Sequence, residues 1–181
     1  MLARVLGEIA SPSLGLELVQ FADDRVDELR AASARALSHS QSSLAIDVLS
    51  ELAHDRTWFV RLRAMVSLGR MSDSRAIPPL LHGLVDSNRL VRLRAAESLV
   101  AATGVSVSVF KRVAAAHDRY GLHAYLAALE NADLAQKLRE KLECDLQLSA
   151  DEKSRLRAEL DCGYLTEQRL HSMVQETAVL A

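Results

Sequence analysis

Histidine and cysteine carry the side chains most able to bind metals or attack a substrate, and this chain scatters both. The six histidines are His39, His54, His82, His117, His123 and His171. They form neither an H-E-x-x-H motif nor a pair spaced i, i+4, the helical arrangements that hold a zinc ion. His117, Asp118 and His123 can meet across a turn, but ordinary surface histidines at helix ends explain the same pattern. We therefore predict no metal site.

Nucleophilic and phosphate-binding chemistry has equally little support. Cys144 and Cys162 have no histidine close in sequence and no metal-type spacing, so we expect two thiols in a reducing compartment. The chain has no G-x-G-x-x-G, G-x-x-x-x-G-K-[ST] or G-x-S-x-G motif. Paired acids such as Asp23 and Asp24 are common in loops and indicate nothing by themselves. We predict no catalytic residue, no cofactor and no enzymatic activity.

Composition places the chain among ordinary soluble, helix-rich proteins. Of 181 residues, 49% are hydrophobic and 25% are charged, with only seven Gly and three Pro. The formal net charge is −2, which gives no global basic or acidic signal. No stretch approaches the roughly 18 apolar residues of a membrane helix, and Glu8 comes too early for a secretory signal. We expect a cytoplasmic protein that does not insert into membranes.

A repeat with a period of 31 residues organises most of the sequence. Residues 29–37 align with residues 60–68 and with residues 91–99. Three further columns keep the same period: Asp24, Asp55 and Asp86; Leu18, Leu49 and Leu80; Leu6, Leu37, Leu68 and Leu99. Several independent columns with one period indicate repeated structural units.

Each unit contains two amphipathic helical patterns. The first helix is predicted at 14–22, 44–53 and 76–85, and the second starts near Asp27, Trp58 and Arg89 and continues for three turns. In the middle unit the apolar face of the second helix consists of Val60, Ala64, Met65 and Leu68. Thr57 and Asn88 are the expected N-caps. Two such helices bury their apolar faces only by stacking on neighbouring pairs, so the sequence predicts an all-α solenoid of antiparallel helix pairs.

The pattern Asp-x4-Val-Arg-x2-Ala-Ala/Met-x2-Leu resembles the HEAT repeat, in the short bacterial form also seen in phycobilisome lyases. The resemblance covers roughly Met1 to Glu130 and implies an armadillo-like superhelix. It also implies that an arginine column and an aspartate column form a ladder between stacked repeats. The ladder residues are Arg30, Arg61 and Arg92, paired with Asp24, Asp55 and Asp86. We expect HEAT-like repeats over 1–131 and a helical cap over 132–181.

The two ends depart from the repeat. Residues 6–9 sit one period before Leu37, so the chain starts either within a repeat of a longer solenoid or with a terminal cap, and a half repeat there would permit self-association. A fourth unit at 107–130 keeps the helical layout without the signature. Three helices are expected at 133–147, 150–162 and 165–179, with a capping box at Ser149 and Glu152. They form either the cap or a docking element for another part of a larger protein.

Function is predicted here only as a class. Residues 56–120 carry eleven Lys and Arg against four Asp and Glu, a local positive field able to attract an acidic partner or phosphates. The first hypothesis is a non-catalytic scaffold that binds another protein through its concave face. The second is a nucleic-acid backbone binder that uses the basic block. The third, by analogy of fold alone, is a lyase-like chromophore handler.

The predicted partner site lies on the second helices, which line the concave side of HEAT-like stacks. Positions that fall off the apolar stripe of these helices should be neighbours there, and an exposed tryptophan beside arginines has the composition of an interaction hot spot. The predicted site residues are Trp58, Phe59, Leu62, Arg63, Val66, Arg70, Arg89, Leu93, Arg94 and Glu97. The alternative is that Trp58 and Phe59 only pack the groove between repeats.

Overall fold

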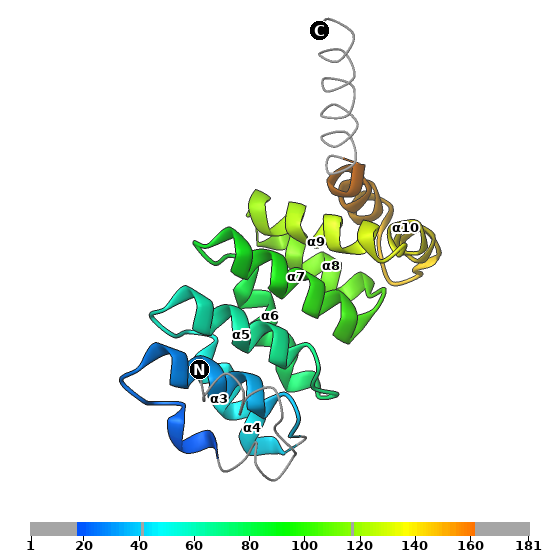
Figure 1. Cartoon of the computed structure of the whole chain (residues 1–181). Helices are drawn as coiled ribbons and strands as arrows, with labels where there is room; N and C mark the ends of the chain where they lie inside the picture. The colour runs from blue at the N-terminus through cyan, green and yellow to red at the C-terminus, as the bar shows by residue number, and fades with distance from the viewer. Residues whose placement is uncertain (1–17, 41, 117, 162–181) are drawn as a thin grey trace, which may run out of the picture. The chain divides into compact units, whose positions relative to one another are not determined.

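The computed structural model describes residues 18–40, 42–116 and 118–161 (Figure 1). Its helices are η1 Leu18–Phe21, α3 Asp27–Leu37, α4 Ser43–Leu52, α5 Trp58–Leu68, η2 Ser74–Ala76, α6 Ile77–Gly83, α7 Arg89–Thr103, α8 Val107–Ala115, α9 Arg119–Asn131 and α10 Ala135–Cys144. Residues 150–161 are also helical, and no strand occurs among the described residues. The predicted all-α fold is confirmed.

The chain divides into two compact units, Met1–Gly104 and Val105–Ala181. The division falls at a backbone feature, because Gly104 ends α7 with φ of 57° and ψ of −138°. This conformation is open to glycine and strained for other residues.

Helices of the first unit form two layers. The second helices of the repeats, α3, α5 and α7, lie side by side, with α5 packed between the other two. The first helices, α4 and α6, lie behind them in Figure 1, and α4 and α6 each pack on the following second helix. Adjacent repeats therefore share one core.

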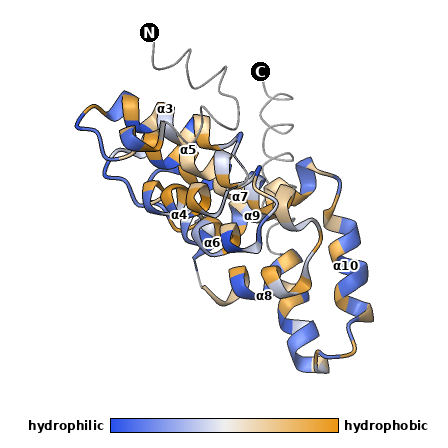
Figure 2. Cartoon of the chain, turned by 90° about the horizontal axis from the view of Figure 1, so that it is seen from below, coloured by the Kyte–Doolittle hydropathy of each residue, from blue (hydrophilic) through white to orange (hydrophobic). Residues whose placement is uncertain are grey.

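The repeating leucine columns supply this core. Leu37, Leu68 and Leu99, one on each second helix, are completely buried, as are Leu49 and Leu80 on the first helices. Figure 2 shows hydrophobic and hydrophilic residues alternating around these helices, as expected when one face of each is buried. The 31-residue period therefore places equivalent side chains at equivalent depths of the core.

Local signals explain where several helices begin. The side chain of Asn88 accepts a hydrogen bond from the Leu90 amide at 2.9 Å, as predicted for an N-cap. Thr57 occupies the predicted N-cap position of α5, but its side chain makes no cap hydrogen bond there, and its hydroxyl donates to Asp27 Oδ2 at 2.9 Å. This bond ties the start of α5 to the first residue of α3 in the preceding repeat.

First helices deviate most from the predicted bounds. Of the helix expected at 14–22, the described residues form the short 3₁₀ helix η1. The helix expected at 76–85 starts with η2, where the Asp73 side chain accepts from the Arg75 amide at 2.9 Å, and continues as α6. Pro79 lies in the first turn of α6, where a missing amide proton costs little.

The second unit contains α8, α9, α10 and the helix at 150–161. Phe110 on α8 stacks on Tyr125 on α9 with ring centroids 6.4 Å apart, and both side chains are completely buried. The capping box forms as predicted, because the Glu152 amide donates to Ser149 Oγ and the Ser149 amide donates to Glu152 Oε2. The predicted half repeat at 6–9 and the helix at 165–179 lie outside the described residues.

Within the described part of the chain, no helix is long and apolar enough to cross a membrane.

Candidate functional site

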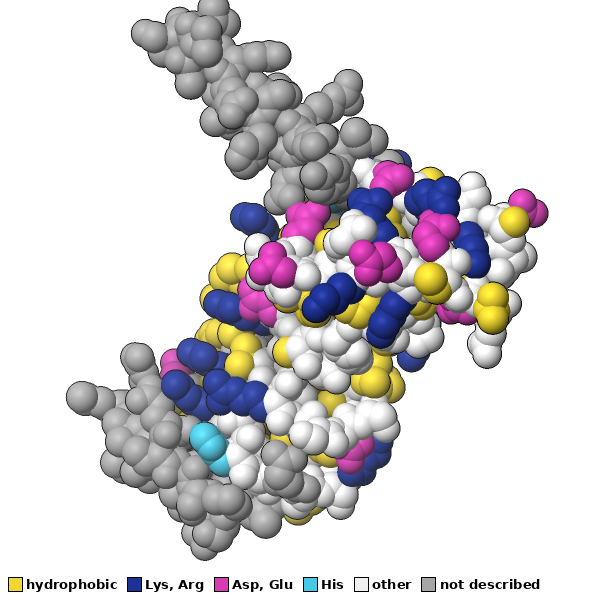
Figure 3. Space-filling view, turned by 90° about the vertical axis from the view of Figure 1, so that its right-hand side faces the viewer, with side chains coloured by type: hydrophobic (Ala, Val, Ile, Leu, Met, Phe, Trp, Pro, Cys, Tyr) yellow, Lys and Arg dark blue, Asp and Glu magenta, His cyan; other side chains and the backbone are white. Residues whose placement is uncertain are grey.

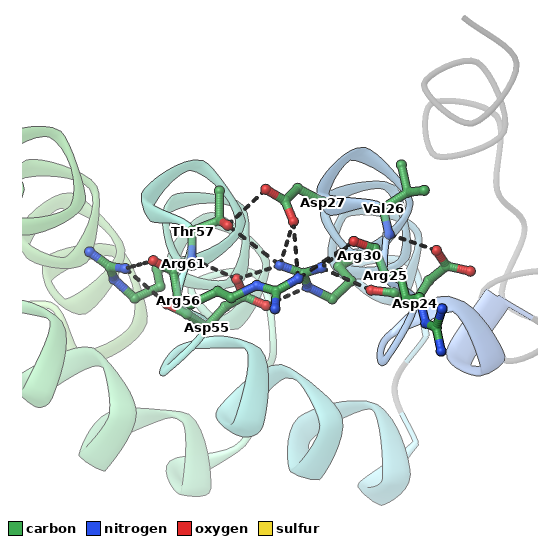
Figure 4. Close-up of polar contacts among 9 residues, drawn as sticks. All are labelled: Asp24, Arg25, Val26, Asp27, Arg30, Asp55, Arg56, Thr57 and Arg61. Atoms are coloured by element: carbon green, nitrogen blue, oxygen red, sulfur yellow. Dashed lines mark hydrogen bonds and ion pairs between the residues drawn. The ribbon is translucent and has the colours of Figure 1, made fainter.

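Two arginines of the first unit bind aspartates of the following repeat through paired hydrogen bonds. Arg30 donates from Nε to Asp55 Oδ2 at 2.6 Å and from Nη2 to Asp55 Oδ1 at 2.9 Å (Figure 4). Arg61 donates from Nε to Asp86 Oδ2 at 2.7 Å and from Nη2 to Asp86 Oδ1 at 2.9 Å. The planar guanidinium matches a carboxylate in this bidentate geometry, so each pair fixes both position and orientation.

The same guanidinium groups also hold the loop that precedes their own helix. Nη1 of Arg30 donates to the main-chain oxygen of Asp24 at 2.8 Å, and Nη1 of Arg61 donates to that of Asp55 at 2.8 Å. Arg92 repeats the contact with the main-chain oxygen of Asp86 at 2.7 Å. The arginine and aspartate of one repeat therefore meet through the main chain, whereas the side-chain pairs join consecutive repeats.

Each ladder aspartate also organises its own turn. The carboxylates of Asp24, Asp55 and Asp86 all accept a hydrogen bond from the amide two residues later, at 2.8, 2.7 and 2.8 Å. Asp and Asn side chains are well suited to this local turn. In Asp55 and Asp86 the same carboxylate therefore serves both the turn and the arginine of the preceding repeat.

Electrostatics follow this geometry. Burial alone would raise the pKa of Asp55, but hydrogen bonds from Arg30 and from the Thr57 amide outweigh it, so the pKa lies below its usual value. Burial would also raise the pKa of Asp86, but hydrogen bonds from Arg61 and from the Asn88 amide outweigh it and hold that pKa below its usual value. The hydrogen bond to Asp86 raises the pKa of Arg61. The ladder pairs are therefore ionised at neutral pH.

Helices α5 and α7, which carry the predicted partner-binding residues, pack against each other. Trp58 is 42% exposed at the start of α5, and Arg63, Arg70, Arg89 and Arg94 are also exposed. The remaining predicted residues are partly buried: Phe59, Leu62, Val66, Leu93 and Glu97. In Figure 3, Lys and Arg side chains lie beside hydrophobic ones along the left-hand margin. We call the ten predicted partner-binding residues, five exposed and five partly buried, the α5–α7 surface.

Contacts within the α5–α7 surface limit its mobility and its charge. Trp58 and Phe59 contact each other edge to face, with ring centroids 5.9 Å apart and ring planes at 89°. Arg94 forms an ion pair with Glu97 at 2.6 Å. Nη1 of Arg70 donates to the Oγ atom of Ser38, the residue after α3, at 3.5 Å. The surface is thus a mixed one, with a semi-exposed aromatic pair among partly compensated arginines.

Comparison with known families agrees with the repeat pattern. The family model for HEAT repeats matches residues 15–100. This part of the chain belongs to the HEAT-repeat family. HEAT repeats typically form protein-interaction scaffolds and are generally non-catalytic. No curated protein matches the sequence.

One exposed apolar residue of the HEAT repeats escaped the sequence analysis. Leu90 is 49% exposed at the start of α7, next to Arg89. In the repeat alignment Leu90 corresponds to Phe59, 31 residues earlier, which is one of the predicted site residues. The alignment alone could therefore have added Leu90 to the predicted site. Trp58 and Leu90 thus expose apolar side chains at the starts of two neighbouring HEAT helices, α5 and α7.

The described residues include several potential metal ligands. Among the described residues, no group of three or more His, Cys, Asp or Glu is arranged to hold a metal ion. His123 lies exposed in α9, and Asp118 acts as the N-cap of that helix by accepting from the Gly121 amide at 2.6 Å. The N-cap bond accounts for Asp118 without a ligand role.

Proposed function

We propose that this protein is a non-catalytic scaffold that binds another protein through the α5–α7 surface. The observation that carries the proposal is Trp58, a large aromatic side chain that remains 42% exposed although α5 is packed between two other helices. Tryptophan and arginine are enriched among the residues that dominate binding energy at protein interfaces. Trp58 and the exposed arginines of α5 and α7 supply both types.

The ladder supports the proposal because it makes the surface rigid before any partner arrives. The Arg30–Asp55 pair ties α3 to the loop before α5, and the Arg61–Asp86 pair ties α5 to the loop before α7. Both pairs are largely buried, with the Arg30 side chain 5% exposed and the Asp55 side chain 9% exposed. A preorganised surface loses less conformational entropy on binding and therefore binds more tightly.

Ion pairing favours a protein partner over a nucleic-acid backbone. Arg61, Arg75 and Arg94 belong to the basic block of residues 56–120, and each forms an ion pair with an acid of this chain. A backbone binder relies on cations that neutralise phosphates, and compensated cations contribute less. The exposed apolar side chains Trp58 and Leu90 have no use against a sugar-phosphate backbone but suit a protein surface.

A paired-variant binding experiment tests the proposal. The surface variant combines Trp58→Ala with Arg94→Glu, and the control combines Leu44→Ala with Glu51→Arg on exposed positions of α4. Proteins retained by the wild-type chain are then titrated individually against the wild type and both variants. We expect the surface variant to weaken Kd by about 30-fold, equivalent to about 2 kcal/mol.

Two results would contradict the proposal. One is a partner whose affinity is unchanged in the surface variant and abolished in the α4 control, which would place binding on the first-helix layer. The other is binding only to nucleic acid, with affinity that falls steeply as salt rises. Circular dichroism of both variants checks that the helical content is intact.

A further inference from the structure

Two histidines separated by 28 residues in sequence meet on the first-helix layer of the first unit. His54 follows the C-terminus of α4, and His82 lies in the last turn of α6. Their rings stack with centroids 4.6 Å apart and an interplanar angle of 29°. Both side chains are exposed. The sequence analysis passed over this pair because no short spacing connects the two residues.

A main-chain contact determines which nitrogen of His54 can bind a ligand. Its Nδ1 lies 2.9 Å from the main-chain oxygen of Ser50. A carbonyl oxygen only accepts hydrogen bonds, so Nδ1 must carry the proton, and in the neutral ring Nε2 keeps its lone pair. Histidines that bind metals commonly donate their other ring N–H to a backbone carbonyl in this way, which fixes the ring orientation.

The side chain of His82 is the second proposed ligand, and its orientation is less constrained than that of His54. No hydrogen bond of its ring occurs among the described residues, so the ring is able to turn about its side-chain bonds. Stacked rings do not both point at one ion, so a shared ion requires the His82 ring to turn about its side-chain bonds. Metal–nitrogen bonds of about 2.0–2.1 Å make two rings at this separation close enough to share one ion.

The surroundings of the pair suit a cation. Both histidines lie at helix C-termini, where the helix dipole is negative. Glu51, exposed on α4, precedes His54 by three residues and occupies the repeat position of His82 one unit earlier. Arg56, two residues after His54, is the nearest basic residue in sequence. Its charge is partly compensated, because its Nη2 lies 3.7 Å from Asp27 Oδ1.

We propose that His54 and His82 form an open, two-histidine site for a divalent transition-metal ion. Imidazole nitrogen favours Zn²⁺, Ni²⁺ and Cu²⁺ among the divalent metals. In this proposal the two imidazoles are the protein ligands, and water completes the coordination. Such a site binds its ion reversibly and differs from the α5–α7 surface in both layer and chemistry.

Zn²⁺ titration by calorimetry in a non-chelating buffer tests the site. We compare the full-length wild type with His54→Ala, with His82→Ala and with His123→Ala, whose exposed histidine lies on α9. Both substitutions in the pair should weaken the tightest Zn²⁺ binding at least about tenfold, since even lost second-shell contacts cost this much. The double variant should bind no more weakly than either single variant, and His123→Ala should bind like wild type.

Wild-type Zn²⁺ affinity in either variant of the pair, or a loss caused by only one of them, overturns the two-histidine site. Because both side chains are exposed, the variants keep the core, and circular dichroism checks this directly. Trp58→Ala with Arg94→Glu should bind Zn²⁺ normally, so failure of the partner surface and failure of the metal site are distinguishable.

Discussion

At the scale of single residues, the chain distinguishes two arginines on the same helix that differ by two positions. Arg61 binds Asp86 through two hydrogen bonds and is 16% exposed, whereas Arg63 is exposed. The motif Val-Arg-Leu-Arg contains both, and only the repeat period identifies Arg61 as the ladder member. Position within the repeat, and not residue type, therefore predicts which arginine joins the ladder.

Replacing these two arginines should have unequal effects on stability. Arg61→Ala leaves Asp86 with a part-buried charge and should lower the free energy of unfolding by up to about 3–5 kcal/mol. Arg63→Ala removes an exposed side chain, for which a change below about 1 kcal/mol is expected. Urea denaturation of both variants measures the difference. Equal midpoints would show that the ladder contributes nothing specific.

The ladder also predicts how stability depends on pH. The pKa values of Asp55 and Asp86 are lower in the folded chain than in the unfolded one. Their contribution is therefore complete at neutral pH and is lost as pH falls below about 4, through the lowered folded values. Asp86→Asn should flatten this acid dependence in urea titrations across the acidic range. An unchanged acid dependence in Asp86→Asn would contradict the assignment.

Removing the buried hydroxyl of Tyr125 in the second unit, unlike removing a ladder side chain, is not expected to lower stability. Tyr125 is completely buried, its hydroxyl has no hydrogen-bond partner among the described residues, and burial raises its pKa to about 12. Tyr125→Phe removes a group whose desolvation costs about 1–3 kcal/mol and should maintain or raise stability. Thermal unfolding, with the exposed Tyr120→Phe as the control, measures it. A lower melting temperature for Tyr125→Phe alone would reveal a bond that the hydroxyl makes.

At the scale of elements, periodicity predicted the second helices better than the first. Val60, Ala64, Met65 and Leu68 are all completely buried, as their spacing indicates. Leu18 keeps the repeat period, yet η1 is a short 3₁₀ helix, because period alone does not specify which hydrogen bonds form. Thr57 shows the same limit at a helix start: its hydroxyl binds Asp27, thirty residues earlier in sequence, and no local pattern predicts that contact.

The ladder residues were predictable from the sequence, but their side-chain partners were not. Ladder membership follows from repeat register, but the pairing of Arg30 with the aspartate of the next repeat depends on how repeats stack. The His54–His82 contact depends on the same stacking and has no local signature. Sequence periodicity thus assigns residues to positions, and stacking geometry decides which positions touch.

Close approach of α5 and α7 makes a prediction of its own. A Cβ added to Gly69 would lie 2.4 Å from Ser98 Cβ on α7, well inside van der Waals contact. Gly69→Ala should therefore push the helices apart and cost about 1–3 kcal/mol. Adding Ser98→Gly removes the obstructing atom, so the double variant should recover part of the loss. Additive effects in this double-mutant cycle, measured by urea denaturation, would mean that the two helices do not meet at this point.

At the scale of the whole molecule, the chain combines a HEAT-repeat unit and a second helical unit that lacks the ladder signature. The first unit has a core repeated by period, with Leu37, Leu68 and Leu99 in equivalent places. The second unit has an aromatic core, in which Phe110 stacks on Tyr125. Because each unit has its own buried core, each is expected to resist local opening separately.

Hydrogen exchange of a core variant tests this separation. Phe110→Ala removes a completely buried ring and should cost the second unit about 3–5 kcal/mol. Amides of α8, α9 and α10 should then exchange faster, while those of α5 and α7 keep their protection. Arg61→Ala should produce the reverse pattern, because its ion pair with Asp86 lies wholly within the first unit. Equal loss of protection in both units with either variant would show that the 181 residues unfold as one cooperative body.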